Sequence, residues 1–236
     1  VKYKCGVCKE CVKQKAREIK QKLLEDIKVN RNAKFVTFTF SDKALYKLEN
    51  EFRELKGYDL DNEVITTAIN RMSLRIKKET GHRMRRFIVS ELGGTRTERI
   101  HCHGIIWNLE AETIRKNWEM YGHVHIGEYV NERTIGYIVK YIYKTDFKHK
   151  EYKPKIISSR GIGKDFIYTN TAKIIRNNSL NGTIMYRLPN GRKEPLNYQF
   201  KKWLLTEEEI ERETIKNIEN PERYIGGIKV KKTDEE

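Results

Sequence analysis

Two apolar segments separated by a glycine-rich turn place the strongest constraint on the fold of this chain. Residues 86–92 (Arg-Phe-Ile-Val-Ser-Glu-Leu) and 100–107 (Ile-His-Cys-His-Gly-Ile-Ile-Trp) are rich in β-branched and aromatic residues, which is typical of strands. Because Gly93-Gly94-Thr95 follows the first segment, we expect the two to pair as an antiparallel hairpin. Side chains alternate between the faces of a strand, so His101 and His103 should leave the same face of this hairpin.

Helical and strand patterns alternate around this hairpin. Residues 33–40 alternate aromatic and β-branched residues as a strand does, and residues 62–78 carry an apolar stripe at helical spacing that ends at Gly81. We also expect helices over 44–55, 112–119, 132–145 and 207–216, a strand over 123–126, a loop over 156–164, and a hairpin over 183–196 around Pro189-Asn190-Gly191. This order predicts an α+β fold with a central antiparallel β-sheet flanked by helices.

The 236 residues are enough for one large domain with appendages. We expect a cysteine-containing N-terminal helical segment over residues 1–30, the main domain over 31–200, and a charged C-terminal helix and tail over 201–236.

The chain is strongly basic, with 48 Lys and Arg against 33 Asp and Glu and a formal net charge of +15. Such an excess favours a polyanionic partner, either nucleic acid or an anionic membrane, although a basic surface that only aids solubility is the alternative. No stretch approaches the roughly 18 consecutive apolar residues of a membrane span, and no signal peptide leads the sequence. Four cysteines are too few for a disulfide framework, so we expect a nucleic-acid partner in a reducing cytoplasm.

Glu91 adds a carboxylate to the face that carries His101 and His103. It lies on the preceding strand among apolar neighbours, where pairing with a cation would remove the cost of burying its charge. Two imidazoles and one carboxylate suit Mg²⁺ or Mn²⁺, and zinc could also occupy such a site. The His-x-His spacing alone is weak evidence, because His123-Val-His125 repeats it. Either pair is also typical of partly buried strand histidines, and we interpret the second pair as structural or DNA-facing.

The expected helix over residues 132–145 carries two tyrosines one turn apart, Tyr137 and Tyr141. Tyrosines at this spacing usually pack in a core. On a helical wheel, however, they fall opposite the apolar stripe, together with Lys140 and Lys144. The stripe consists of Ile135, Ile138, Val139 and Ile142. Either lysine could favour a phenolate or bind a phosphate.

A metal site beside paired tyrosines on a basic chain indicates cleavage of DNA by a tyrosine nucleophile. The cation would polarise a phosphate and a tyrosine would attack phosphorus, which forms a 5′-phosphotyrosine link and a free 3′-hydroxyl. A second tyrosine allows a second cleavage while the first strand is still attached, as the end of a rolling-circle replication round requires.

These motifs resemble, in content and order, those of the HUH endonuclease replication initiators (Rep proteins) of single-stranded DNA phages, the Microviridae, particularly the gokushovirus type. The matching pieces are Cys5-Gly-Val-Cys8-Lys-Glu-Cys11, residues 35–40, Glu91 ahead of His101-Cys-His103, residues 137–144, and Ser159-Arg-Gly-Ile-Gly163. The central position of His-x-His is usually a bulky apolar residue in that family; here it is Cys102, which can pack as a small hydrophobe.

The resemblance implies an RRM-like or ferredoxin-like HUH endonuclease domain over residues 31–200. It implies a metal-dependent nickase and strand transferase acting on single-stranded origin DNA in the cytoplasm of a bacterial host. His101, His103 and Glu91 become metal ligands, and Tyr137 and Tyr141 become alternating nucleophiles. Because no Gly-x-x-x-x-Gly-Lys-Ser/Thr loop occurs, unwinding would fall to a host helicase, with a host polymerase copying the strand.

The N-terminal cysteines and several basic residues complete the expected sites. Cys5, Cys8 and Cys11 offer three thiolates, one short of a closed zinc site; the fourth ligand could be His123, His125 or a residue upstream of Val1. An unmetallated cysteine-rich turn is the alternative.

Arg160 and Lys164, in or beside the loop around Gly161, are expected to contact the DNA backbone. Basic residues over 13–28 and 71–78, including Arg71 and Arg75, are expected to grip a single strand while aromatic rings stack on bases.

Two alternatives to a phage initiator remain. A plasmid replication protein, relaxase or single-strand transposase would have the same site. A non-catalytic nucleic-acid-binding module would bind no metal tightly and form no covalent adduct.

Overall fold

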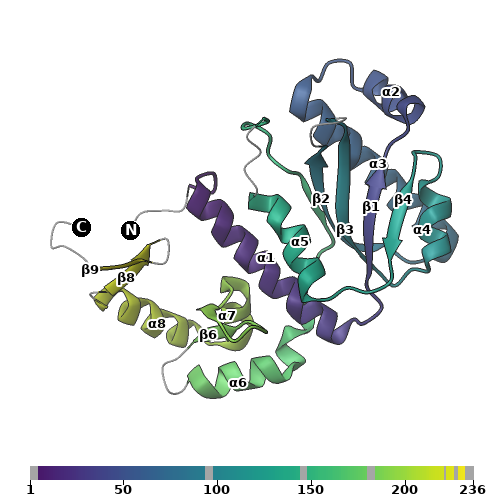
Figure 1. Cartoon of the computed structure of the whole chain (residues 1–236). Coiled ribbons are helices and arrows are strands. Elements are labelled where there is room, and N and C mark those ends of the chain that lie inside the picture. The colour runs from purple at the N-terminus through teal and green to yellow at the C-terminus, as the bar shows by residue number, and fades with distance from the viewer. Residues whose placement is uncertain are drawn as a thin grey trace.

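The computed structural model describes residues 5–93, 98–143, 148–179, 184–220, 222–225 and 228–231. It forms an α+β fold, as predicted (Figure 1). In chain order the main elements are α1 (Lys9–Val29), β1 (Lys34–Thr39), α2 (Asp42–Glu51), α3 (Gly57–Thr80), β2 (Arg85–Leu92), β3 (Ile100–Trp107), α4 (Ala111–Trp118), β4 (Val124–Gly127), α5 (Glu132–Tyr143) and β5 (Ile156–Ser158). There follow η1 (Lys164–Tyr168), α6 (Asn170–Ser179), β6 (Met185–Arg187), β7 (Lys193–Pro195), α7 (Tyr198–Leu204), α8 (Glu207–Glu219), β8 (Glu222–Ile225) and β9 (Ile228–Lys231).

The central sheet has the strand order β4-β1-β3-β2-β5, and every neighbouring pair is antiparallel. The first four strands and the helices between them form a split β-α-β arrangement of the ferredoxin-like type, to which β5 adds an edge strand. The predicted hairpin of β2 and β3 is present, and Glu91 pairs directly with His101.

Helices cover both faces of this sheet. On one face, the apolar stripe of α3 packs with the inward residues of the strands, and Cys102 is fully buried among them. This helix ends at Gly81, whose φ of 78° few other residues tolerate. On the other face, α1 and α5 lie together over Phe87 and Ile105 (Figure 1). The His101 and His103 side chains belong to this second face, because they share the strand parity of Ile105.

The core of the second face continues into the C-terminal part of the chain. Phe166 and Phe200 stack with their ring centroids 3.8 Å apart, and Tyr186 donates a hydrogen bond to the buried carboxylate of Glu25 on α1 at 2.6 Å. Helix α1 therefore shares one hydrophobic cluster with α5, β2 and β3.

Three parts differ from the expectations. The predicted loop over 156–164 begins with β5, whose three residues pair with β2. Helices α6 and α7 were not predicted, and the tail beyond α8 forms the β8–β9 hairpin. Gly94, Thr95, Thr145 and Thr183 lie outside the described residues. Over the described ranges, no helix combines the length and the apolar character needed to cross a bilayer.

Candidate metal centre and tyrosine helix

Glu91, His101 and His103 converge on one point at the surface of the sheet. The Nε2 atoms of His101 and His103 lie 3.2 and 2.9 Å from the same carboxylate oxygen, Oε2 of Glu91. The strand pairing explains this arrangement, because Glu91 lies opposite His101 and diagonal to His103. The structure thus brings together the three residues that the sequence nominated as metal ligands.

The other ring nitrogens are held by partners outside this group. Nδ1 of His101 lies 3.2 Å from the carbonyl oxygen of Arg99, and Nδ1 of His103 lies 2.9 Å from the hydroxyl of Thr37. Since a carbonyl can only accept, Nδ1 of His101 must carry a proton. A neutral His101 then directs the lone pair of Nε2 at the Glu91 carboxylate, an arrangement that needs a cation or a second proton between them.

These distances fit a shared divalent cation. In an octahedral site with ligands at about 2.1 Å, adjacent ligand atoms are about 3.0 Å apart, close to the two separations observed here. Outer hydrogen bonds like those of Thr37 and Arg99 orient metal-binding histidines in known sites. The donor set therefore suits Mg²⁺ or, given its two nitrogens, Mn²⁺.

Both tyrosines of α5 adjoin this group. The ring of Tyr141 stacks on His103 at 4.7 Å between centroids, and the ring of Tyr137 meets His103 edge-on at 5.5 Å. The two tyrosine rings are 5.0 Å apart. Tyr137 is 44% exposed, so its phenol is open to solvent beside the metal ligands.

Tyr141 differs from the expectation that both phenols lie away from the core, because it is buried at 9% exposure. Helix α5 contacts both α1 and the sheet, so its buried arc is wider than the apolar stripe. Burial, then the Tyr137 phenol and the negative charge of Glu91, raise the pKa of Tyr141 above its usual value. This phenol stays protonated unless a cation offsets the charge of Glu91.

The two lysines of the predicted catalytic set have different outcomes. Lys140 is exposed on the solvent side of α5. Lys144 lies outside the described residues. Their roles stay predictions.

Two residues near the site were missed in the sequence, Thr37 and Phe35 on β1. Thr37 pairs in register with His103 on one side and with His125 on the other. The ring of Phe35 lies nearly parallel to that of His103, at 6.2 Å. A polar residue in the alternating run 35–40 was the available signal for Thr37.

A cavity of about 510 Å³ extends from this group toward the edge strand β4. Tyr137, Phe35, His125, Tyr129 and Arg133 contribute to its lining. Tyr129 is 83% exposed, and Arg133 forms no ion pair with any residue that the structure describes. The second histidine pair thus lies at the surface of the same sheet face as the first, His123 and His125 both being exposed.

The predicted DNA-binding residues fall on two sides of the sheet. Arg160 and Lys164 are exposed, and Arg160 lines a cavity of about 470 Å³ with Lys15 and Lys22 of α1. Phe87 also lines this cavity and shares the sheet face of Glu91.

Arg71 and Arg75 lie on α3, across the sheet from the metal ligands. Arg71 donates two hydrogen bonds to Glu51, at 3.1 and 2.6 Å, and Arg75 donates to the carbonyl oxygen of Asn117 at 2.8 Å. The structure does not group them with the site, and their contact with DNA stays a prediction.

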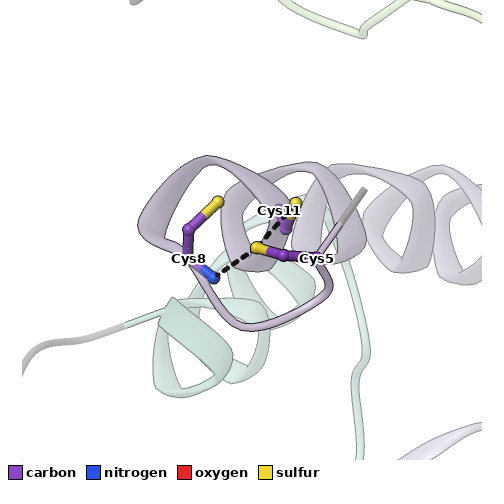
Figure 2. A group of neighbouring side chains, drawn as sticks. All are labelled: Cys5, Cys8 and Cys11. Carbon is purple, nitrogen blue, oxygen red and sulfur yellow. Dashed lines mark hydrogen bonds between the residues drawn. The ribbon is translucent and has the colours of Figure 1, made fainter. Parts of the chain in front are cut away.

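The three N-terminal cysteines form a second group of potential ligands (Figure 2). Cys5 and Cys8 are exposed and Cys11 is half-buried at the start of α1; all three are free. His123 and His125, the predicted sources of a fourth ligand, lie on or beside β4, on the opposite side of the molecule from the first turn of α1 (Figure 1).

Comparison with known proteins adds a family match for the part of the chain that holds the metal ligands. Neither the curated proteins nor the solved structures contain a significant match to the chain. Residues 33–146, however, match the family model of the replication-associated proteins of the ORF2 type. The matched range contains Glu91, His101, His103 and both tyrosines, whereas the cysteine group lies outside it. The match supports a role in replication initiation in general.

Proposed function

We propose that this protein initiates rolling-circle replication by nicking and rejoining single-stranded origin DNA through a 5′-phosphotyrosine intermediate. The observation that carries the proposal is the convergence of His101, His103 and Glu91 beside two stacked tyrosines. The family match supports the replication role, and the HUH-type chemistry rests on the arrangement of these side chains.

His101, His103 and Glu91 would hold Mg²⁺ or Mn²⁺ through two Nε2 atoms and one carboxylate oxygen. When bound, such a cation polarises the phosphate and stabilises charge that develops on its oxygens. The protein side of the site is already ordered, because Thr37 and the Arg99 carbonyl fix both rings from behind. Three protein ligands leave positions open for phosphate and water.

Tyr137 is the first nucleophile in this proposal, because its phenol is exposed beside the ligands. Its Oη forms a bond to phosphorus while the bond from phosphorus to the 3′-oxygen breaks. The phenol loses its proton and the departing 3′-oxygen gains one, so atoms and charge balance. The phosphodiester is conserved as a phosphotyrosine, and a 3′-hydroxyl can reverse the reaction without ATP.

Tyr141 is the second nucleophile. Its burial and raised pKa make it the less reactive phenol before a strand is bound. Once Tyr137 is esterified, Tyr141 is the nearest free phenol on α5, at 5.0 Å between ring centroids. A second cleavage by Tyr141 would release a unit-length circle.

The two cavities beside the ligands suit a single strand. On the β4 side, Phe35 and Tyr129 offer rings for stacking and Arg133 offers a cation. On the β5 side, Lys15 and Arg160 border apolar surface. Aromatic platforms interleaved with basic groups are the usual means of binding single-stranded nucleic acid without sequence preference.

The test is covalent capture. The protein is incubated with circular single-stranded DNA carrying the origin and Mn²⁺, then separated on a denaturing gel. We expect an adduct that EDTA prevents and that disappears in the Tyr137→Phe/Tyr141→Phe double variant. The exposed Tyr168→Phe variant, outside the site, serves as the control. An absence of adduct with a verified origin would refute the enzyme and leave a non-catalytic DNA-binding module. Cleavage only at hairpin ends would indicate a transposase instead.

A further inference from the structure

The sulfur atoms of Cys5, Cys8 and Cys11 face one another at the beginning of α1 (Figure 2). Residues 5–8 form a tight turn that needs Gly6, whose φ is 75°. The turn lets the backbone N–H of Cys8 donate to Sγ of Cys5 at 3.3 Å. Cys11 follows on the first turn of the helix, and its Sγ lies 3.9 Å from that of Cys5.

We infer that Cys5, Cys8 and Cys11 bind one zinc ion, with the fourth coordination position left to a donor from outside the described residues or to water. Zinc binds thiolates at about 2.3 Å in a tetrahedron, which separates the sulfurs by about 3.8 Å. The Cys5–Cys11 separation of 3.9 Å already has this value, and all three sulfurs lie within 4.8 Å of one another. Binding would thus need little rearrangement.

The surroundings favour thiolates over thiols. The backbone N–H groups of Cys8 and Val7 lower the pKa of Cys5 to about 7. The group also lies at the N-terminus of a 21-residue helix, where the aligned peptide dipoles stabilise negative charge. Cys102, by contrast, is fully buried in the core across the sheet, where burial raises the pKa of its thiol.

The ion would fasten the start of α1 to the rest of the domain. Val12, one residue after Cys11, packs in the hydrophobic cluster that includes Ile138 and Val139 of the tyrosine helix. Ordering the cysteine turn would therefore stabilise the contact between α1 and α5. This inference is independent of DNA cleavage, because it requires neither Tyr137 nor the His101–His103 group.

Cobalt substitution tests the site directly. The full chain is stripped of metal under reducing conditions and titrated with Co²⁺, and the thiolate-to-cobalt charge-transfer band in the near ultraviolet is recorded. We expect one equivalent of Co²⁺ to produce the band, Zn²⁺ to abolish it by displacement, and the Cys8→Ser variant to lose it. His101→Ala should retain the band, which separates this site from the metal centre on the sheet.

Native mass spectrometry and thermal unfolding provide a second readout. We expect one zinc per chain in the wild type and none in Cys8→Ser, with a chelator lowering the Tm of the wild type only. The inference is overturned if no charge-transfer band forms, if Cys8→Ser retains it, or if the reduced chain binds no zinc. Failure here would leave the proposed nickase untouched, because adduct formation is measured separately.

Discussion

Thr37 holds His103 from the neighbouring strand, and removing its hydroxyl should weaken metal binding without disturbing the sheet. The two residues pair in register, and the hydroxyl lies 2.9 Å from Nδ1 of His103. Thr37→Val keeps a β-branched side chain on β1, so strand propensity is preserved. The substitution therefore tests whether His103 is a ligand oriented from behind.

The structure sets the size of the effect. Partners of metal-bound histidines are typically worth about 10- to 100-fold in metal affinity, or about 1.4 to 2.7 kcal/mol. The ring of His103 is also held between Tyr141 and Phe35, at 4.7 and 6.2 Å between centroids. These contacts limit rotation after the hydroxyl is lost, so we expect a loss of about tenfold, the lower end of the range.

Isothermal titration of the protein with Mn²⁺ measures this loss. Thr39→Val is the matched control, because Thr39 lies two residues along the same face of β1 and its hydroxyl donates to the carbonyl oxygen of His123. We expect Thr39→Val to bind Mn²⁺ like the wild type. An unchanged affinity in Thr37→Val, or an equal loss in both variants, would refute the reasoning that Thr37 orients a ligand.

Three further predictions follow from the same geometry. Tyr137→Phe should abolish the first covalent adduct on a denaturing gel while Tyr141→Phe retains one cleavage; the reverse result would contradict the order proposed. Gly104→Ala should cost about 1–3 kcal/mol in urea unfolding because its Cβ would lie 2.5 Å from the carbonyl oxygen of Phe87, whereas Gly136→Ala, with open space around it, should stabilise α5 by about 0.5–1 kcal/mol. Stability should fall as the pH rises above about 10, because burial raises the pKa of Tyr186 and the unfolded chain loses that proton first; a stability that rises there would exclude this cause.

The sequence predicts the metal group well because each step depends on local rules. Strand alternation puts His101 and His103 on one face, and a short hairpin connection makes the preceding strand their neighbour. The only non-local quantity is the register of β2 against β3, which the observed pairing of Glu91 with His101 confirms.

Features that depend on distant parts of the chain were not predictable in this way. The burial of Tyr141 was missed because a helical wheel assumes one buried face, whereas α5 is covered by α1 as well as by the sheet. The strand β5 consists of three residues whose pairing with β2 spans more than sixty positions. Nor does the charge on α3 reveal which face of the sheet that helix covers, and this face decides where Arg71 lies.

The division of the site between strands and a helix has a mechanical consequence for the proposed reaction. The ligands lie on β2 and β3, and each of these strands is hydrogen-bonded on both sides. Their side chains are therefore held by the ladder and by Thr37 on β1. The tyrosines lie on α5, which meets the sheet through side chains alone. Small rotations of a helix cost less than a change of strand register, since packing contacts can be exchanged while ladder hydrogen bonds must break. A fixed metal centre facing an adjustable helix is the arrangement that two alternating nucleophiles require, because each phenol in turn must reach the same phosphate.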